Sequence, residues 1–301
     1  MVKIKNIPRK IARTSTMKLL TLTSDFGLHD HYVASLKASI IRRDASVQMI
    51  DISHNIIPFD TAQAAYVLNS CFSEFVEGTV HIIAVDSEPI VHFGGHDGSF
   101  PCILELNGQF VISTDNGFFG AFLGERMPDQ FWRIDDILSN PKLFKFPSKN
   151  MLVPAAIDIL NGKELATFCS PQETYKKAYM SLPKVEENLI VGHIAYIDSY
   201  GNSITNIDQE LFERVGKNHP YTIFFRKKDY YLDVISNSYN EVPPGERVCI
   251  FNENRFLEIA INRGANLGGG GAEKLFGLKK GDQVRIEFMP RGSKETLHEL
   301  F

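Results

Sequence analysis

The pattern of apolar residues changes near residue 185, and this change limits the chain to few architectures. Before that point, strand-like and helix-like runs alternate, which is typical of an α/β domain with a mostly parallel sheet. After it, the apolar runs are short, strand-like and bounded by Gly, Pro, Asn or Asp, which is typical of a small β-barrel or sandwich. A chain of 301 residues also has about the length that two domains need. The sequence therefore predicts an α/β N-terminal domain followed by an all-β C-terminal domain.

We place the α/β domain at residues 17–182, a polar linker at 183–189 and the barrel domain at 190–301. Residues 1–16 are basic and lack the apolar core of a secretory signal, so we expect a disordered extension there. In the first domain we expect strands at 18–23, 47–52 and 79–85, helices at 32–42, 61–72 and 151–160, and a hairpin formed by 102–106 and 109–113. In the second domain we expect strands at 189–197, 221–226, 230–235, 247–251, 256–261 and 283–288.

Composition excludes several classes of partner. The net charge of −4 argues against nucleic-acid binding, because such domains are usually basic. No apolar run approaches the roughly 18 residues that a membrane-spanning helix needs. The four cysteines lack CxxC spacing, so we expect buried, reduced thiols in a cytoplasmic protein rather than metal ligands.

Acidic residues stand directly after apolar runs in both halves of the chain. Asp25 follows the first expected strand, and Asp86 follows the most apolar one. Ligands of open α/β sheets bind beyond the carboxyl ends of the strands, where Asp25 could accept two hydrogen bonds from a ribose diol. Capping of the next helix is the alternative role for Asp25. In the second half, Asp198, Tyr200 and Asn202 combine an acid, a flat ring and an amide, which suits a nucleoside that carries an amino-acid group.

Three further positions each have a functional and a structural interpretation. Phe59 could cover the apolar part of a ligand, whereas its neighbour Asp60 would simply cap the helix from residue 61. Asn116 could bind a polar ligand edge, although Asp-Asn-Gly is primarily turn chemistry. Ser148 lies near the start of a helix, where it could favour an anion or serve as a cap.

Residues 90–100 form a glycine-rich segment that we expect to be a mobile active-site loop. His92 and His96 lie four residues apart, as metal ligands on a helix do. The surrounding glycines argue against a helix, so no metal site is predicted and His92 is instead a candidate for assisting catalysis.

Taken together and in this order, the motifs resemble those of the S-adenosyl-L-methionine hydroxide adenosyltransferase family, which includes the fluorinase and chlorinase enzymes. The motifs that carry the resemblance are residues 22–27, 51–54, 57–60, 78–81, 115–117, 197–202 with 205–206, and 258–264. The resemblance implies a homotrimer in which the N-terminal domain of one subunit and the C-terminal domain of the next enclose a nucleoside. It also implies S-adenosylmethionine as the substrate, and no cofactor.

The resemblance further suggests a role for individual residues. Asp25 would bind the ribose diol, Phe59 would cover the sugar and the sulfonium, and Asp198 would bind the amino group of the methionine part. Tyr200 and, as a weaker match, Tyr239 would stack on adenine, Asn202 would bind its edge, and the backbone at Arg263 would read it.

The sequence departs from the hydroxide-transferring members at two catalytic positions. Their catalytic acid is retained as Asp86, but no arginine occurs in the following run, and Pro147 stands where they have a histidine. Ser148 resembles the serine that contacts halide in the fluorinase-like members. Three functions remain open: hydrolysis by water with Asp86 as base, assisted by His92 if its loop folds inward; binding of S-adenosylmethionine or adenosine without catalysis; and attack by a halide or another anion.

Overall fold

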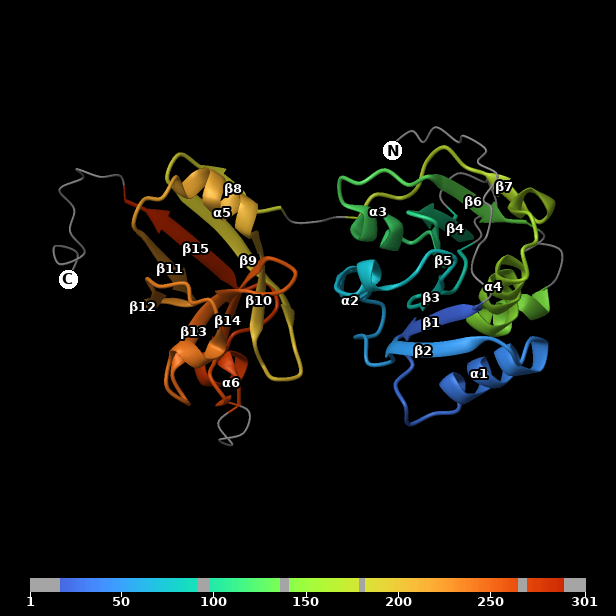
Figure 1. Cartoon of the computed structure of the whole chain (residues 1–301), viewed down its shortest axis with the longest axis horizontal. Coiled ribbons are helices and arrows are strands. Elements are labelled where there is room, and N and C mark those ends of the chain that lie inside the picture. Colours follow the sequence, from blue (N-terminus) through green and yellow to red (C-terminus); the bar gives the residue numbers. More distant parts are fainter. Residues whose placement is uncertain (1–16, 91–97, 136–140, 179–181, 265–269, 290–301) are drawn as a thin grey trace. The chain divides into compact units, whose positions relative to one another are not determined.

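The computed structural model describes residues 17–90, 98–135, 141–178, 182–264 and 270–289 (Figure 1). The expected extension at 1–16 therefore lies outside the described residues. The chain divides into two compact units, the N-terminal unit up to residue 180 and the C-terminal unit from residue 181.

The N-terminal unit is built on one mixed sheet with the strand order β2-β1-β3-β5-β4-β6-β7. Its strands are β1 (Leu19–Ser24), β2 (Gln48–Ser53), β3 (Val80–Ala84), β4 (Pro101–Leu106), β5 (Gln109–Thr114), β6 (Gln130–Ile134) and β7 (Cys169–Pro171). The first four strands in this order run parallel, and the β4–β5 hairpin then reverses the direction. The parallel strands β1, β2, β3 and β5 therefore end at the same edge of the sheet.

Helices cover both faces of this sheet (Figure 1). They are α1 (Tyr32–Arg43), α2 (Thr61–Asn69), α3 (Phe118–Leu123) and α4 (Val153–Leu160), with short helical turns at Phe72–Glu74, Pro141–Lys145 and Leu165–Thr167. Apolar residues of α1 and α4 pack in one core cluster, and those of α2 and α3 pack in a second. The predicted α/β architecture is thus confirmed, with strands such as β3 buried along their whole length because both sheet faces are covered.

Two features of the N-terminal unit lie outside this sheet-and-helix pattern or mark one strand of it. The helical segment expected from residue 151 begins earlier, as a π-helical turn at Ser148–Leu152 that continues into α4. The chain's single tryptophan, Trp132, lies on β6 and packs partly buried against the cluster that α1 and α4 share.

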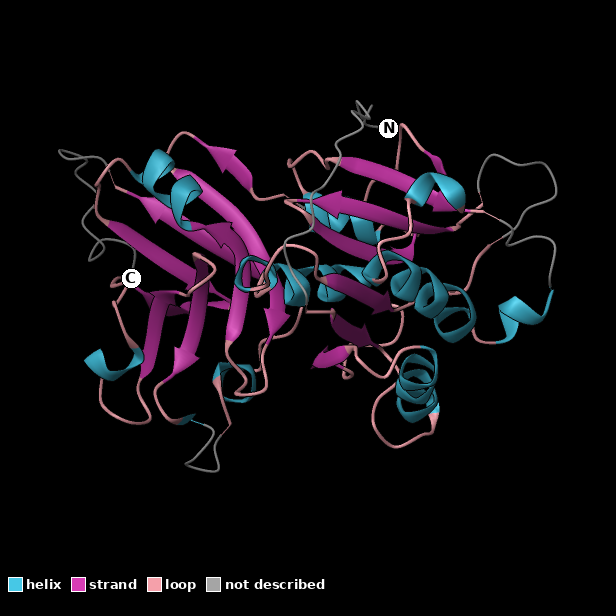
Figure 2. Cartoon of the chain, turned by 45° about the vertical axis from the view of Figure 1, so that its right-hand side comes forward, coloured by secondary structure: helices cyan, strands magenta, loops and turns pink. Residues whose placement is uncertain are grey.

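The C-terminal unit is mostly strand, as predicted, and Figure 2 shows its strands in magenta. One antiparallel sheet runs in the order β12-β11-β15-β9-β10-β14-β13, and β8 also pairs with β9. Its strands are β8 (Lys184–Glu186), β9 (Leu189–Ile197), β10 (Ser203–Asp208), β11 (Tyr221–Phe225), β12 (Lys227–Leu232), β13 (Arg247–Phe251), β14 (Phe256–Ile261) and β15 (Gln283–Phe288). The segment after β12 reaches β13 through a hydrogen bond from Ser236 N to Cys249 O of 2.7 Å, which nearly closes the sheet into a barrel.

The structure corrects two expectations for this half of the chain. The stretch expected to be a linker contains β8, whose pairing with β9 makes it part of the C-terminal unit. Two helices interrupt the strands, α5 (Gln209–Gly216) and α6 (Ala272–Phe276), together with a short turn at Tyr239–Glu241. None of the helices in the described ranges combines the length and apolar character needed to cross a membrane.

Candidate functional site

The carboxylate of Asp25 joins three loops at the edge where the parallel strands end. Its Oδ2 atom accepts a hydrogen bond from the backbone N–H of Phe59, at 3.0 Å, and a longer one from that of Asp86, at 3.4 Å. Asp25 follows β1, Phe59 lies between β2 and α2, and Asp86 follows β3. Because α1 begins only at Tyr32, Asp25 does not cap it. Three of the predicted site residues are therefore brought together in the N-terminal unit.

Two of these residues have unusual backbones. Phe59 and Asp86 have φ angles of 67° and 44°, in the left-handed region that residues other than glycine rarely adopt. Strain of this kind persists where the surrounding structure enforces it, and it clusters at functional sites. Phe59 is 73% exposed, so its ring is free to cover a ligand. Its neighbour Asp60 accepts a hydrogen bond from Gln63 N at the start of α2, so the predicted capping role of Asp60 is confirmed.

The electrostatics around Asp86 favour its use as a base. Partial burial raises the pKa of its carboxyl, and the nearby charges of Asp25 and then Glu88 raise it further, while a hydrogen bond from Asn116 opposes them. The amide nitrogen of Asn116 also donates to the Asp86 carbonyl at 2.8 Å, and its Oδ1 accepts from Phe118 N. Asn116 thus holds the Asp86 loop in place, using the polar atoms that were predicted to bind a ligand.

Ser148 contacts the residue that follows Asp86, and it does not cap its helix. Its hydroxyl is fully buried and lies 2.7 Å from the hydroxyl of Ser87, the residue after Asp86. Thr114 at the end of β5 donates to the Ser87 carbonyl at 2.8 Å. Ser87 was not predicted from the sequence, where it resembles an ordinary loop serine. The other catalytic candidate, His92, lies outside the described residues.

A second polar cluster forms in the C-terminal unit, at the hairpin between β9 and β10. Asp198 Oδ1 accepts hydrogen bonds of 2.9 Å from the backbone N–H groups of Tyr200 and Asn202, and its Oδ2 accepts one of 3.1 Å from Asn202 Nδ2. Asp198 therefore shapes the loop that presents Tyr200, whose ring is 66% exposed. The structure brings these three predicted residues together within one short loop.

Tyr239 joins this cluster through a residue that the sequence interpretation had not selected. Its hydroxyl donates to Glu258 Oε1 at 2.5 Å, and Asn202 lowers the pKa of Glu258. An acid inside a strand usually faces solvent, so the strand pattern gave no sign of Glu258. The only signal in the sequence was that Glu258 begins the family motif at residues 258–264. Arg263, the remaining predicted residue, is exposed beyond β14 with a φ of 53°, and it shares no hydrogen bond with this cluster in the described part of the chain.

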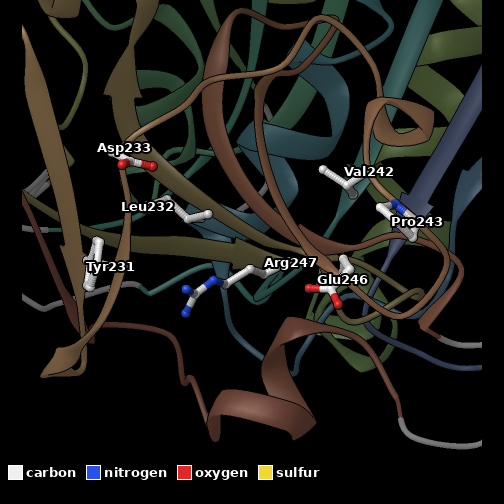
Figure 3. Close-up of a pocket in the computed structure, with 7 residues that line it drawn as sticks. All are labelled: Tyr231, Leu232, Asp233, Val242, Pro243, Glu246 and Arg247. Atoms are coloured by element: carbon white, nitrogen blue, oxygen red, sulfur yellow. The ribbon is translucent and has the colours of Figure 1, made fainter.

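A surface pocket of about 420 Å³ lies elsewhere in the C-terminal unit (Figure 3). It is lined by Tyr231, Leu232, Asp233, Val242, Pro243, Glu246 and Arg247. None of the predicted site residues lines it. Within the described ranges, no three His, Cys, Asp or Glu side chains gather in a group that could hold a metal ion.

Both units match models of one protein family. Residues 20–169 match the SAM hydroxide adenosyltransferase N-terminal domain, and residues 192–285 match the C-terminal domain. The chain belongs to this family. Its sequence is 25% identical over 285 residues to an (R)-S-adenosyl-L-methionine hydrolase from Thermus thermophilus, covering 90% of this chain and 100% of the relative. It is 27% identical over 264 residues to the enzyme of the same name from Methanocaldococcus jannaschii, covering 82% and 90%.

Two solved structures share the fold of this chain. An uncharacterized conserved protein from Thermotoga maritima superposes with a TM-score of 0.75 at 26% identity, over 89% of this chain and 99% of that one. A conserved hypothetical protein from Thermus thermophilus has a TM-score of 0.66 at 24% identity, over 90% and 100%, and this second likeness supports the fold alone.

Proposed function

We propose that this protein hydrolyses S-adenosyl-L-methionine to adenosine and L-methionine. The observation that carries the proposal is the shared carboxylate of Asp25, which bonds the backbones of Phe59 and Asp86 where the parallel strands end. Family membership and the relatives named (R)-S-adenosyl-L-methionine hydrolase support the same substrate.

In the proposed reaction, a water oxygen forms a bond to the ribose C5′ while the C5′–sulfur bond breaks. The sulfur keeps the electron pair and leaves as the neutral thioether of methionine, so this leaving group needs no acid. The water proton passes to the carboxylate of Asp86, whose raised pKa makes it a better proton acceptor than an ordinary aspartate. Ser148 and Ser87 support the loop that holds this base. The reaction uses S-adenosylmethionine as substrate and calls for no cofactor.

The binding roles in this proposal follow the family resemblance. Asp25 binds the ribose diol and Phe59 covers the sugar, whereas Asp198 binds the substrate's amino group. Tyr200, Tyr239, Asn202 and the backbone at Arg263 surround the adenine. The two clusters meet in a homotrimer, between the N-terminal unit of one subunit and the C-terminal unit of the next. We place the protein in the cytoplasm, where its free cysteines stay reduced.

The test is incubation of the purified protein with S-adenosylmethionine in ¹⁸O-labelled water, followed by mass spectrometry of the products. We expect equimolar adenosine and methionine, with one ¹⁸O atom in the 5′-hydroxyl of adenosine. That label identifies displacement at C5′, because no other route places solvent oxygen there.

Three outcomes would contradict hydrolysis, and each points elsewhere. If calorimetry detects binding of S-adenosylmethionine but adenosine forms no faster than in the uncatalysed reaction, the protein is a binding protein that has lost catalysis. A 5′-chloro nucleoside that appears only with added chloride would show an anion as the nucleophile. If the protein neither binds nor turns over S-adenosylmethionine, this compound is not its substrate.

A further inference from the structure

Glu258 is a buried acid on the face of β14 that points away from the barrel core. Its neighbours Leu257 and Ile259 pack in the barrel core, whereas Ala260 packs in a separate small cluster. Because side chains alternate along a strand, Glu258 shares the face of Ala260. Its side chain is nevertheless only 3% exposed.

Glu258 is held by a network of uncharged groups. Its Oε1 accepts the Tyr239 hydroxyl at 2.5 Å, and its Oε2 accepts the amide nitrogen of Asn252 at 3.2 Å. Asn202, which donates to Asp198 Oδ2 at 3.1 Å, also lowers the pKa of Glu258. Of the two hydrogen bonds to the carboxylate, the one from the Tyr239 hydroxyl is the shorter.

The barrel itself does not require an acid at this position. Burying a carboxylate without a cationic partner is costly, and a well-packed apolar residue there would serve stability at least as well. Burial raises the pKa of Glu258, and the nearby charge of Asp198 raises it further, against the hydrogen bonds from Tyr239, Asn252 and Asn202. Among the described residues, the groups acting on its pKa are thus amides, a phenol and another acid, and none of them is a base.

We propose that Glu258 is a positioning residue that fixes the ring of Tyr239 beside the adenine of the substrate. The inference rests on the proposed function, because Tyr239 is assigned there to the adenine. It predicts that Glu258 matters for every ligand that carries the adenine, the bare nucleoside included.

The experiment compares wild-type protein with Glu258→Gln by calorimetric titration with S-adenosylmethionine and with adenosine, and by steady-state kinetics. The control is Glu253→Gln, which makes the same chemical change at an exposed position of the same unit. In Glu258→Gln we expect about tenfold weaker binding of both S-adenosylmethionine and adenosine and a similar rise in KM, with kcat changed less than about twofold. The control should match the wild type in every measurement.

Tyr239→Phe provides a second test in case Glu258→Gln does not fold. It removes only the hydroxyl that donates to Glu258 and keeps the ring, so a similar weakening of both ligands is expected. No change in either ligand, or weaker binding of S-adenosylmethionine with unchanged binding of adenosine, would overturn the inference while leaving hydrolysis by the wild type intact. A wild-type protein that binds neither ligand would reject the proposed function and this inference together.

Discussion

Asp86 combines a left-handed backbone, a partly buried carboxyl and two acidic neighbours. The backbone conformation is maintained by contacts from other loops, since Asp25 accepts its N–H and Asn116 donates to its carbonyl. These contacts fix where its carboxylate lies before any substrate arrives. General bases are effective when they are held in place and have a pKa moved toward the working pH, and Asp86 has both properties.

Replacement of Asp86, the proposed base, gives the first prediction. Asp86→Asn keeps the shape of the side chain but cannot accept the water proton, so we expect kcat to fall by about 10²- to 10⁴-fold with KM changed less than about threefold. Product formation measured across substrate concentrations separates the two constants. Glu88→Gln, at an exposed neighbour, is the control and should keep kcat within about threefold. Full activity in Asp86→Asn would remove Asp86 from the chemistry.

A second acid, Asp115 after β5, makes stability depend on pH. Both of its oxygens accept the backbone N–H of Lys176, and burial raises its pKa from 3.8 to about 6. The folded protein therefore disfavours the ionised form, so this penalty is absent below pH 3.8 and complete above about pH 6. Relative to Asp115→Asn, which does not titrate, the wild type should lose about 3 kcal/mol of unfolding free energy as pH rises through this window. The unfolding free energy of both proteins is measured by urea titration at several pH values. If it changes with pH in the same way for the wild type and for Asp115→Asn, the prediction is wrong.

At the scale of elements, the sequence predicted most strands because their apolar patterns and turn residues are local signals. It missed α5, although Asp208 caps that helix and Leu211 and Val215 lie on its buried side, because strand patterns on both sides dominated the interpretation. The partners of Asp25 and Glu258 could not be predicted, since they depend on loops that are far apart in the sequence. Polar residues at strand ends were predictable, but their bonding was not.

The β9–β10 hairpin offers a test of how tightly the second cluster is built. Gly201 has a φ of 78°, and a Cβ there would lie 3.0 Å from the backbone nitrogen of Gly271. Gly281 has a φ of 89°, and a Cβ added there would have nothing within 4 Å. Its replacement by alanine therefore measures the cost of the positive φ alone. We expect Gly281→Ala to lower the unfolding free energy by about 1 kcal/mol and Gly201→Ala by at least about 2 kcal/mol, as measured by urea denaturation. Equal losses would mean that the contact with Gly271 yields easily.

At the scale of the whole molecule, the proposal requires residues from two subunits in each site. Asp25→Asn and Asp198→Asn should each be inactive alone, because each removes one half of every site. When the two are co-expressed with different tags and mixed trimers are isolated, one of the three junctions pairs an intact N-terminal unit with an intact C-terminal unit. We expect such trimers to regain about one third of wild-type activity. Doubly tagged trimers that remain inactive would exclude a shared site.

The position of Trp132 on β6 makes its intrinsic fluorescence a probe of the N-terminal unit. Because it is the only tryptophan, its emission follows the melting of the α/β unit alone, while the ten tyrosines are spread over both units. Comparison of emission with far-ultraviolet dichroism in one denaturant series therefore distinguishes joint from stepwise unfolding. A barrel variant that shifts the dichroism midpoint and leaves the emission midpoint in place would show that the two halves melt separately.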